Sequence, residues 1–62
     1  MATEVSESDR KSAEEFKNKG NDCFKKDDIE HALEWYSKAI MLNAKEPSYY
    51  SNRAACYLKQ KK

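Results

Sequence analysis

FKNKGNDCF, residues 16–24, and YSNRAACYL, residues 50–58, are two versions of one pattern set 34 positions apart. Six pairs of equivalent positions keep their chemical type, in the order aromatic, amide, cation, small, medium apolar and large apolar. The pairs are Phe16/Tyr50, Asn18/Asn52, Lys19/Arg53, Gly20/Ala54, Cys23/Tyr57 and Phe24/Leu58. A fixed period of about 20 to 50 residues indicates a repeat architecture, in which each unit needs a neighbour to cover its apolar face. The sequence stops four residues after the second version, so we expect one whole repeat and the opening of another.

The composition argues against several classes of function. Twelve basic and eleven acidic residues nearly balance, which argues against electrostatic binding of nucleic acid. No apolar run approaches the roughly 20 residues of a membrane helix, and the polar N-terminus carries no secretory signal. We therefore expect a cytoplasmic protein that does not bind membranes and that keeps Cys23 and Cys56 reduced. A chain this short buries only about 60% of the surface that its unfolded form exposes, so its stability should be marginal.

The residues that enzymes use are not arranged for catalysis in this sequence. The single histidine, His31, has no second histidine and no carboxylate cluster at metal-ligand spacing, and no histidine is placed to activate a serine. A glycine-rich phosphate loop is also missing from the sequence. We therefore expect no enzyme activity, no metal and no cofactor.

Capping and turn signals predict three helices. Ser12 and Glu15 fit a capping box before the first helix. Asp28 is a good N-cap for the second, and Pro47 suits the first turn of the third. Short connections make neighbouring helices antiparallel. The expected helices span about residues 13–26 (or from a turn earlier), 29–42 and 47–60.

Each expected helix has one apolar face for the core of an all-α fold. Gly20 costs about 1 kcal/mol relative to alanine inside a helix, so we expect a second helix to approach it closely. The faces are Phe16, Gly20, Cys23 and Phe24 on the first helix, Ala32, Leu33, Tyr36, Ala39 and Ile40 on the second, and Tyr50, Ala54, Tyr57 and Leu58 on the third. The expected units are a flexible tail at 1–12, a complete helix-turn-helix repeat at 13–46, and the first helix of a second, truncated repeat at 47–62.

The two versions of the pattern resemble the tetratricopeptide repeat (TPR). The family pattern W-x2-L-G-x2-Y…A-x3-F falls on Phe16, Lys19, Gly20, Cys23, Ala32 and Tyr36, and begins again at Tyr50, Arg53, Ala54 and Tyr57. The sequence departs from the pattern where Ala44 replaces the closing proline and where Lys19 and Arg53 occupy the leucine position. The resemblance covers about residues 13–60. It implies a packing core of Phe16, Gly20, Phe24, Ala32, Tyr36, Tyr50, Ala54 and Tyr57.

The substituted positions resemble the first and second repeats of chaperone-adaptor, or co-chaperone, TPR domains. Those domains bind the C-terminal tail of the seventy- and ninety-kilodalton heat-shock proteins, which ends Glu-Glu-Val-Asp. A carboxylate clamp holds the terminal carboxylate of the tail, and the resemblance carries this role onto Lys17, Asn21 and Asn52. Lys17 and Asn21 are four residues apart and share one helix face, from which charge-assisted hydrogen bonds can reach one carboxylate. The family's clamp has two further cations in a third repeat, so the resemblance implies a partial clamp here.

Three alternatives stay open. Lys17 and Asn21 can be solvated surface residues, and Asn52 an amide that braces neighbouring helices. The chain can be a structural module that binds no peptide and that dimerises or exchanges helices through a partly uncovered third helix. It can also be a TPR scaffold for another partner, such as a motor or an import receptor.

Trp35 lies off the inward face of its helix, where it either rests on the third helix or is partly exposed.

Overall fold

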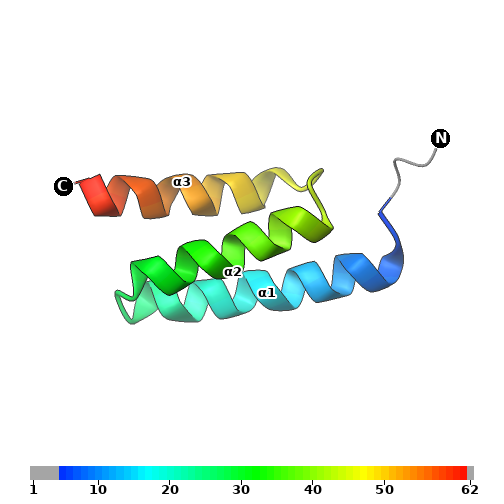
Figure 1. Ribbon diagram of the computed structural model, residues 1–62, viewed down its shortest axis with the longest axis horizontal. Helices are drawn as coiled ribbons and strands as arrows, with labels where there is room; N and C mark the ends of the chain where they lie inside the picture. Colours follow the sequence, from blue (N-terminus) through cyan, green and yellow to red (C-terminus); the bar gives the residue numbers. More distant parts are fainter. Residues whose placement is uncertain (1–4, 62) are drawn as a thin grey trace.

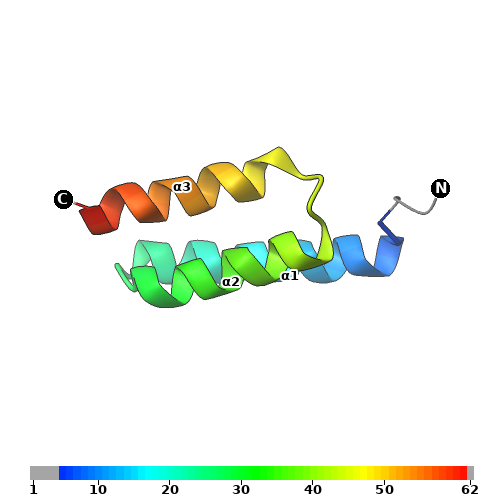
Figure 2. The same cartoon turned by 45° about the horizontal axis from the view of Figure 1, so that its top comes forward.

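The computed structural model describes residues 5–61 and places the second helix between two helices that run antiparallel to it (Figure 1). The helices are α1 (Glu7–Lys25), α2 (Ile29–Leu42) and α3 (Pro47–Lys61). Helices α1 and α3 both pack on α2 and contact each other much less, and α3 lies along one side of the α1–α2 pair (Figure 2). The predicted all-α fold is therefore confirmed for these residues. No helix of this described part has the length and apolar composition of a membrane span.

Helix α1 begins six residues before the predicted start at residue 13. Its N-cap is Ser6, whose side-chain oxygen accepts a hydrogen bond from the backbone N–H of Asp9 at 3.1 Å. Glu7 and Asp9 lie in the first turn, where the helix dipole favours acidic side chains. The prediction of a cap at Ser12 was wrong because Ser6 offers the same spacing to an acidic residue two turns earlier. Residues 7–12 of the expected flexible tail are helical, and residues 1–4 lie outside the described residues.

The turn between α1 and α2 depends on two adjacent aspartates. Asp27 has a φ of 67°, in the left-handed region. The backbone N–H of Asp27 donates to the carbonyl of Phe24 at 3.0 Å, and that of Asp28 to Cys23 at 2.8 Å, which is a Schellman closure of α1. Asp28 then caps α2, as predicted, by accepting from the backbone N–H of His31 at 3.5 Å. This tight turn sets α1 and α2 antiparallel.

Hydrogen bonds between polar groups of residues 43–48 stabilise the connection from α2 to α3. The side-chain oxygen of the buried Asn43 accepts from the backbone N–H of Lys45 at 3.4 Å. The carboxylate of Glu46 accepts from the Ser48 hydroxyl at 3.0 Å. Pro47 occupies the first position of α3, where its missing N–H costs nothing. The predicted third helix is confirmed to within one residue at its end.

Small residues form the crossings of the three helices. One buried cluster joins Ala13, Ala39 and Tyr49, and a second joins Ala32, Tyr36 and Cys56, so each cluster includes a residue from α3. Gly20 is also buried, and a Cβ built on it would lie 2.5 Å from Cε1 of Tyr36. The expected close approach of a second helix to Gly20 is therefore confirmed, because the Tyr36 ring occupies the space that a side chain would need.

The inward face of α3 differs from the predicted one. Tyr50, Ala54 and Tyr57 are exposed, with Tyr50 at 40% and Tyr57 at 53%, and Leu58 is 73% exposed. Tyr49 and Cys56 are buried instead. The prediction failed because these residues of α3 are equivalent, in the 34-residue pattern, to residues of α1 that pack on α2. On α1 this face is covered because α2 follows it. In the described part of the chain no helix follows α3, so that face is uncovered, as the expectation of a partly uncovered third helix required.

Candidate functional site

Two of the three predicted clamp residues line one surface hollow. Asn21 from α1 and Asn52 from α3 both border a hollow of about 270 Å³. Both side chains are half-buried. The remaining wall comes from Phe24, Lys25, Tyr36 and Ala55. The fold therefore brings together two amides that are 31 positions apart in the sequence.

Tyr36 of α2 lies at this hollow and contacts Asn21 directly. Its hydroxyl donates to Oδ1 of Asn21 at 2.5 Å. The Tyr36 ring is 2% exposed, and this burial raises the pKa of its phenol. With its oxygen engaged by Tyr36, the Asn21 side chain has its two N–H donors left for another partner.

Lys17 lies one turn before Asn21 and does not line the hollow. Its ammonium group lies 2.7 Å from a carboxylate oxygen of Glu14, and the Lys17 side chain is 22% exposed. The other carboxylate oxygen of Glu14 accepts from the Tyr49 hydroxyl of α3 at 3.1 Å. The hydrogen bond from Lys17 lowers the pKa of Glu14, whereas burial, and then the bond to Glu14, raise the pKa of Tyr49 to about 12. An internal carboxylate thus holds the cation that was predicted to bind a ligand carboxylate.

Lys25 and Tyr36 are residues of this hollow that sequence reasoning missed as site residues. Lys25 follows Asn21 by four positions, as Asn21 follows Lys17, so the three side chains share one side of α1. That spacing was visible in the sequence and could have identified Lys25. Tyr36 was assigned to the core, and its hydroxyl, which reaches the hollow, gave no separate signal.

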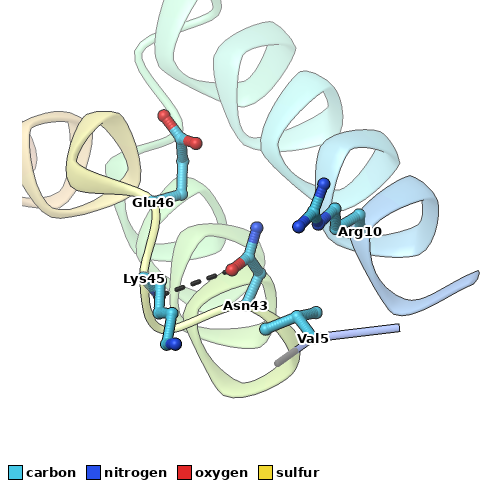
Figure 3. Close-up of a pocket in the computed structure, with 5 residues that line it drawn as sticks. All are labelled: Val5, Arg10, Asn43, Lys45 and Glu46. Atoms are coloured by element: carbon cyan, nitrogen blue, oxygen red, sulfur yellow. Dashed lines mark hydrogen bonds between the residues drawn. The ribbon is translucent and has the colours of Figure 1, made fainter. Parts of the chain in front are cut away.

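A larger hollow of about 430 Å³ lies at the other end of α1 (Figure 3). Arg10 points toward Asn43 across it, and Lys45 and Glu46 border it from the α2–α3 connection. The oxygen of Asn43 is used within the connection, in the bond to Lys45 that Figure 3 marks with a dashed line. Because a carboxylate of the chain accompanies the two cations, the lining of this hollow is of mixed charge and favours no single class of ligand.

Trp35 packs on α1 and is partly exposed. Its ring stacks on Phe16 with centroids 5.5 Å apart. The ammonium groups of Lys19 and Lys38 lie 5.1 and 5.0 Å from its centroid, as expected for cation–π contacts. Lys19, one of the two cations in place of the usual leucine, therefore covers the tryptophan. None of these four residues lines the hollow between Asn21 and Asn52.

Comparison with known proteins identifies the class to which this helical hairpin and its following helix belong. Residues 20–61 match the family described as TPR repeat, and the chain belongs to the tetratricopeptide repeat family. This family is a non-enzymatic helical repeat module. No solved structure gave a significant match to the chain.

Several curated proteins are similar to the chain over most of its length. The E3 ubiquitin-protein ligase CHIP of Arabidopsis thaliana is 45% identical over 49 residues, which cover 79% of this chain and 18% of that protein. Serine/threonine-protein phosphatase 5 of Homo sapiens is 49% identical over 49 residues, or 79% of this chain and 10% of the phosphatase. The Hsp70-Hsp90 organizing protein of Triticum aestivum is 47% identical over 51 residues, or 82% of this chain and 9% of that protein. The chain thus spans less than a fifth of the length of these relatives.

Proposed function

We propose that this chain is a protein-interaction module of the co-chaperone type, which binds the acidic C-terminal tail of heat-shock chaperones through a partial carboxylate clamp. The observation that carries the proposal is the hollow that Asn21 and Asn52 line together. Amide N–H groups from two helices can converge there on one carboxylate. In the same proposal, residues 13–46 act as a complete repeat, residues 47–62 open a second one, and the protein works in the cytoplasm.

The charges around the hollow suit an acidic chain terminus. Asn21 and Asn52 supply donors to the terminal carboxylate, and hydrogen bonds to a charged group are each worth about 1.5–3 kcal/mol. Lys17, one turn along α1, supplies an ammonium group once the ligand carboxylate competes with Glu14 for it. Lys25 lines the hollow and gives a second cation for acidic side chains of the same tail. An internal peptide segment has no terminal carboxylate, so this site selects chain ends.

The names of the relatives support chaperones as the partner class. One similar protein is named an Hsp70-Hsp90 organizing protein, and it is 47% identical over 82% of this chain. Two other relatives are named a ubiquitin ligase and a phosphatase. Those activities are not proposed for this chain, because the part that matches is a repeat module.

Titration calorimetry with a short peptide that ends Glu-Glu-Val-Asp tests the proposal. The free acid should bind on the order of tenfold more tightly than the same peptide amidated at its C-terminus, because amidation removes the charge that the clamp holds. Asn21→Ala and Asn52→Ala should each remove most of this preference. Asn18→Ala is the matched control, since Asn18 is an exposed amide of α1 that does not line the hollow.

Equal affinity for the two peptides would rule out the clamp. The clamp would also be ruled out if Asn18→Ala reduced the preference for the free acid as much as Asn21→Ala does. Such a result would assign the effect to α1 as a whole and not to the hollow.

A second candidate function is self-association without peptide binding. The exposed face of α3 formed by Tyr50, Tyr57 and Leu58 favours it, since exposed apolar patches tend to be covered by other protein surface. We call these three residues the open face of α3. A second copy of the chain that covered the open face would act as the missing neighbour of a repeat.

A further inference from the structure

The Asn21 amide is held in one orientation by a hydroxyl that sequence reasoning assigned to the core. A free asparagine side chain can turn either its oxygen or its two N–H groups toward a ligand. Here the Tyr36 hydroxyl donates to Oδ1 of Asn21 at 2.5 Å, so the oxygen is engaged and the N–H groups remain. An Asn21 side chain that presents only donors attracts a carboxylate and rejects a ligand group that must itself donate.

The Tyr36 hydroxyl has no competing partner in the described part of the chain. The ring packs among apolar and weakly polar residues, including Cys23, Phe24 and Cys56, and the bond to Asn21 is the one hydrogen bond that its side chain makes there. Burial raises the pKa of this phenol, so it keeps its proton, and with it the ability to donate, at neutral pH.

The close approach of the α1 backbone at Gly20 limits the position of the Tyr36 ring. A Cβ at Gly20 would lie 2.5 and 2.7 Å from two carbon atoms of the ring, which leaves the ring in direct contact with the backbone of α1. Gly20 directly precedes Asn21, so two adjacent residues of α1 contact Tyr36: Gly20 packs against its ring, and Asn21 accepts a hydrogen bond from its hydroxyl. The equivalent dipeptide of the second version is Ala54-Ala55, which has neither feature.

We propose that Tyr36 is a positioning residue, which turns the N–H groups of Asn21 toward the ligand carboxylate and so gives the hollow its preference for a free chain terminus. This inference rests on the proposed clamp and adds a specificity-determining residue to it. Tyr36 does not itself need to touch the ligand. Its effect on binding passes through the Asn21 amide.

Tyr36→Phe tests the inference, because it removes the hydroxyl and keeps the ring. We expect the free-acid peptide to bind on the order of fivefold more weakly and the affinity of the amidated peptide to stay within twofold, the loss being that of one orienting hydrogen bond. Tyr50→Phe is the matched control, since it also deletes a tyrosine hydroxyl, one that donates to the Ala44 carbonyl away from the hollow.

A double-mutant cycle separates positioning from a structural role. If Tyr36 acts through Asn21, Tyr36→Phe should cost nothing further in an Asn21→Ala background, whereas a general loss of stability would weaken both backgrounds alike. Side-chain amide ¹⁵N relaxation of the unmutated protein adds a readout that needs no variant. The Asn21 side-chain Nδ2 should be markedly more rigid than that of the exposed Asn18.

The outcomes distinguish this inference from the function on which it rests. An unmutated chain without any preference for the free acid overturns both. A preference that is present and survives Tyr36→Phe unchanged overturns the role of Tyr36 alone, as does an Asn21 amide that is as mobile as that of Asn18.

Discussion

The Tyr49 hydroxyl links α3 to α1 through a single carboxylate. Tyr49 is 1% exposed and donates to Glu14, which also holds Lys17. The folded protein thus binds the phenol proton more tightly than the unfolded chain does, and the pKa of Tyr49 rises to about 12. For a group whose folded pKa is raised, the stabilisation is complete below the unfolded pKa of about 10 and is lost as the pH rises toward the folded value.

We therefore predict that thermal stability falls between pH 10 and about 12 and that Tyr49→Phe makes this fall shallower. Circular dichroism melts across this range give the midpoints, and absorbance at alkaline pH follows the ionisation of tyrosine. Tyr36 has a pKa raised in the same direction, so the variant should reduce the slope without abolishing it. A slope that Tyr49→Phe leaves unchanged would contradict the prediction.

At the same scale, part of the site could be predicted from the sequence. The resemblance to chaperone-adaptor TPR domains indicated Asn21 and Asn52, and the two amides do share a hollow. The role of Tyr36 could not be predicted, because apolar periodicity describes where a ring is buried and carries no information on where its hydroxyl points. The pairing of Lys17 with Glu14 was equally hidden, since a lysine on this side of α1 can turn to either neighbouring turn.

At the scale of single elements, the end of α1 contains a strained position. Asp27 has a φ of 67°, where residues other than glycine cost roughly 1–2 kcal/mol and aspartate somewhat less. Its side chain lies 3.6 Å from the ammonium of Lys59, but both groups are largely exposed, so this ion pair contributes little. The conformation is set by the Schellman hydrogen bonds and not by the side chain.

We predict that Asp27→Gly stabilises the protein by about 0.5–1 kcal/mol, because glycine adopts this conformation without strain. The melting temperature should rise by roughly 2–8 °C for a domain of this size. Asp27→Ala should lower it, and Asp27→Asn should stay close to the unmutated protein. Thermal melts at one pH rank the four proteins, and a glycine variant less stable than the alanine variant would show that the side chain and not the backbone matters here.

The elements also show which signals in the sequence define a helix. Asp28 directly precedes the apolar period of α2 and Pro47 suits the first turn of α3, so the starts of α2 and α3 were predicted correctly. The start of α1 had two candidate caps, and both Ser6 and Ser12 are followed three residues later by an acidic side chain, so this signal does not decide between them. For α3 the apolar period marked a face correctly as apolar, but a period does not tell which neighbouring helix covers that face.

At the scale of the whole molecule, α3 carries an apolar surface that no other described helix covers. Tyr57 and Leu58 of the open face are 53% and 73% exposed, which is unusual for large apolar side chains placed so close together. The corresponding positions of α1 are Cys23 and Phe24, and both pack against the buried cluster around Tyr36. The open face thus exposes positions whose equivalents on α1 are packed.

We predict that the chain self-associates through the open face as its concentration rises. Sedimentation velocity from micromolar to millimolar concentration should show a growing average mass, and a Tyr57→Glu, Leu58→Glu double variant should stay monomeric because a buried carboxylate is costly. Met41→Glu is the control, since Met41 is 83% exposed and belongs to α2. A chain that is monomeric at millimolar concentration would exclude this second candidate function.

The stack of Trp35 on Phe16 also makes the protein its own optical probe. Trp35 is the single tryptophan of the sequence, and its ring reports on the seam between α1 and α2, which is the neighbourhood of Lys19 and Lys38. Its emission follows the separation of that seam, because its aromatic and cation–π partners lie on α1 and α2. Trp35 fluorescence therefore reports on the α1–α2 seam, whereas far-ultraviolet ellipticity reports on all three helices. A difference between the fluorescence and ellipticity unfolding curves therefore measures how independently α3 unfolds.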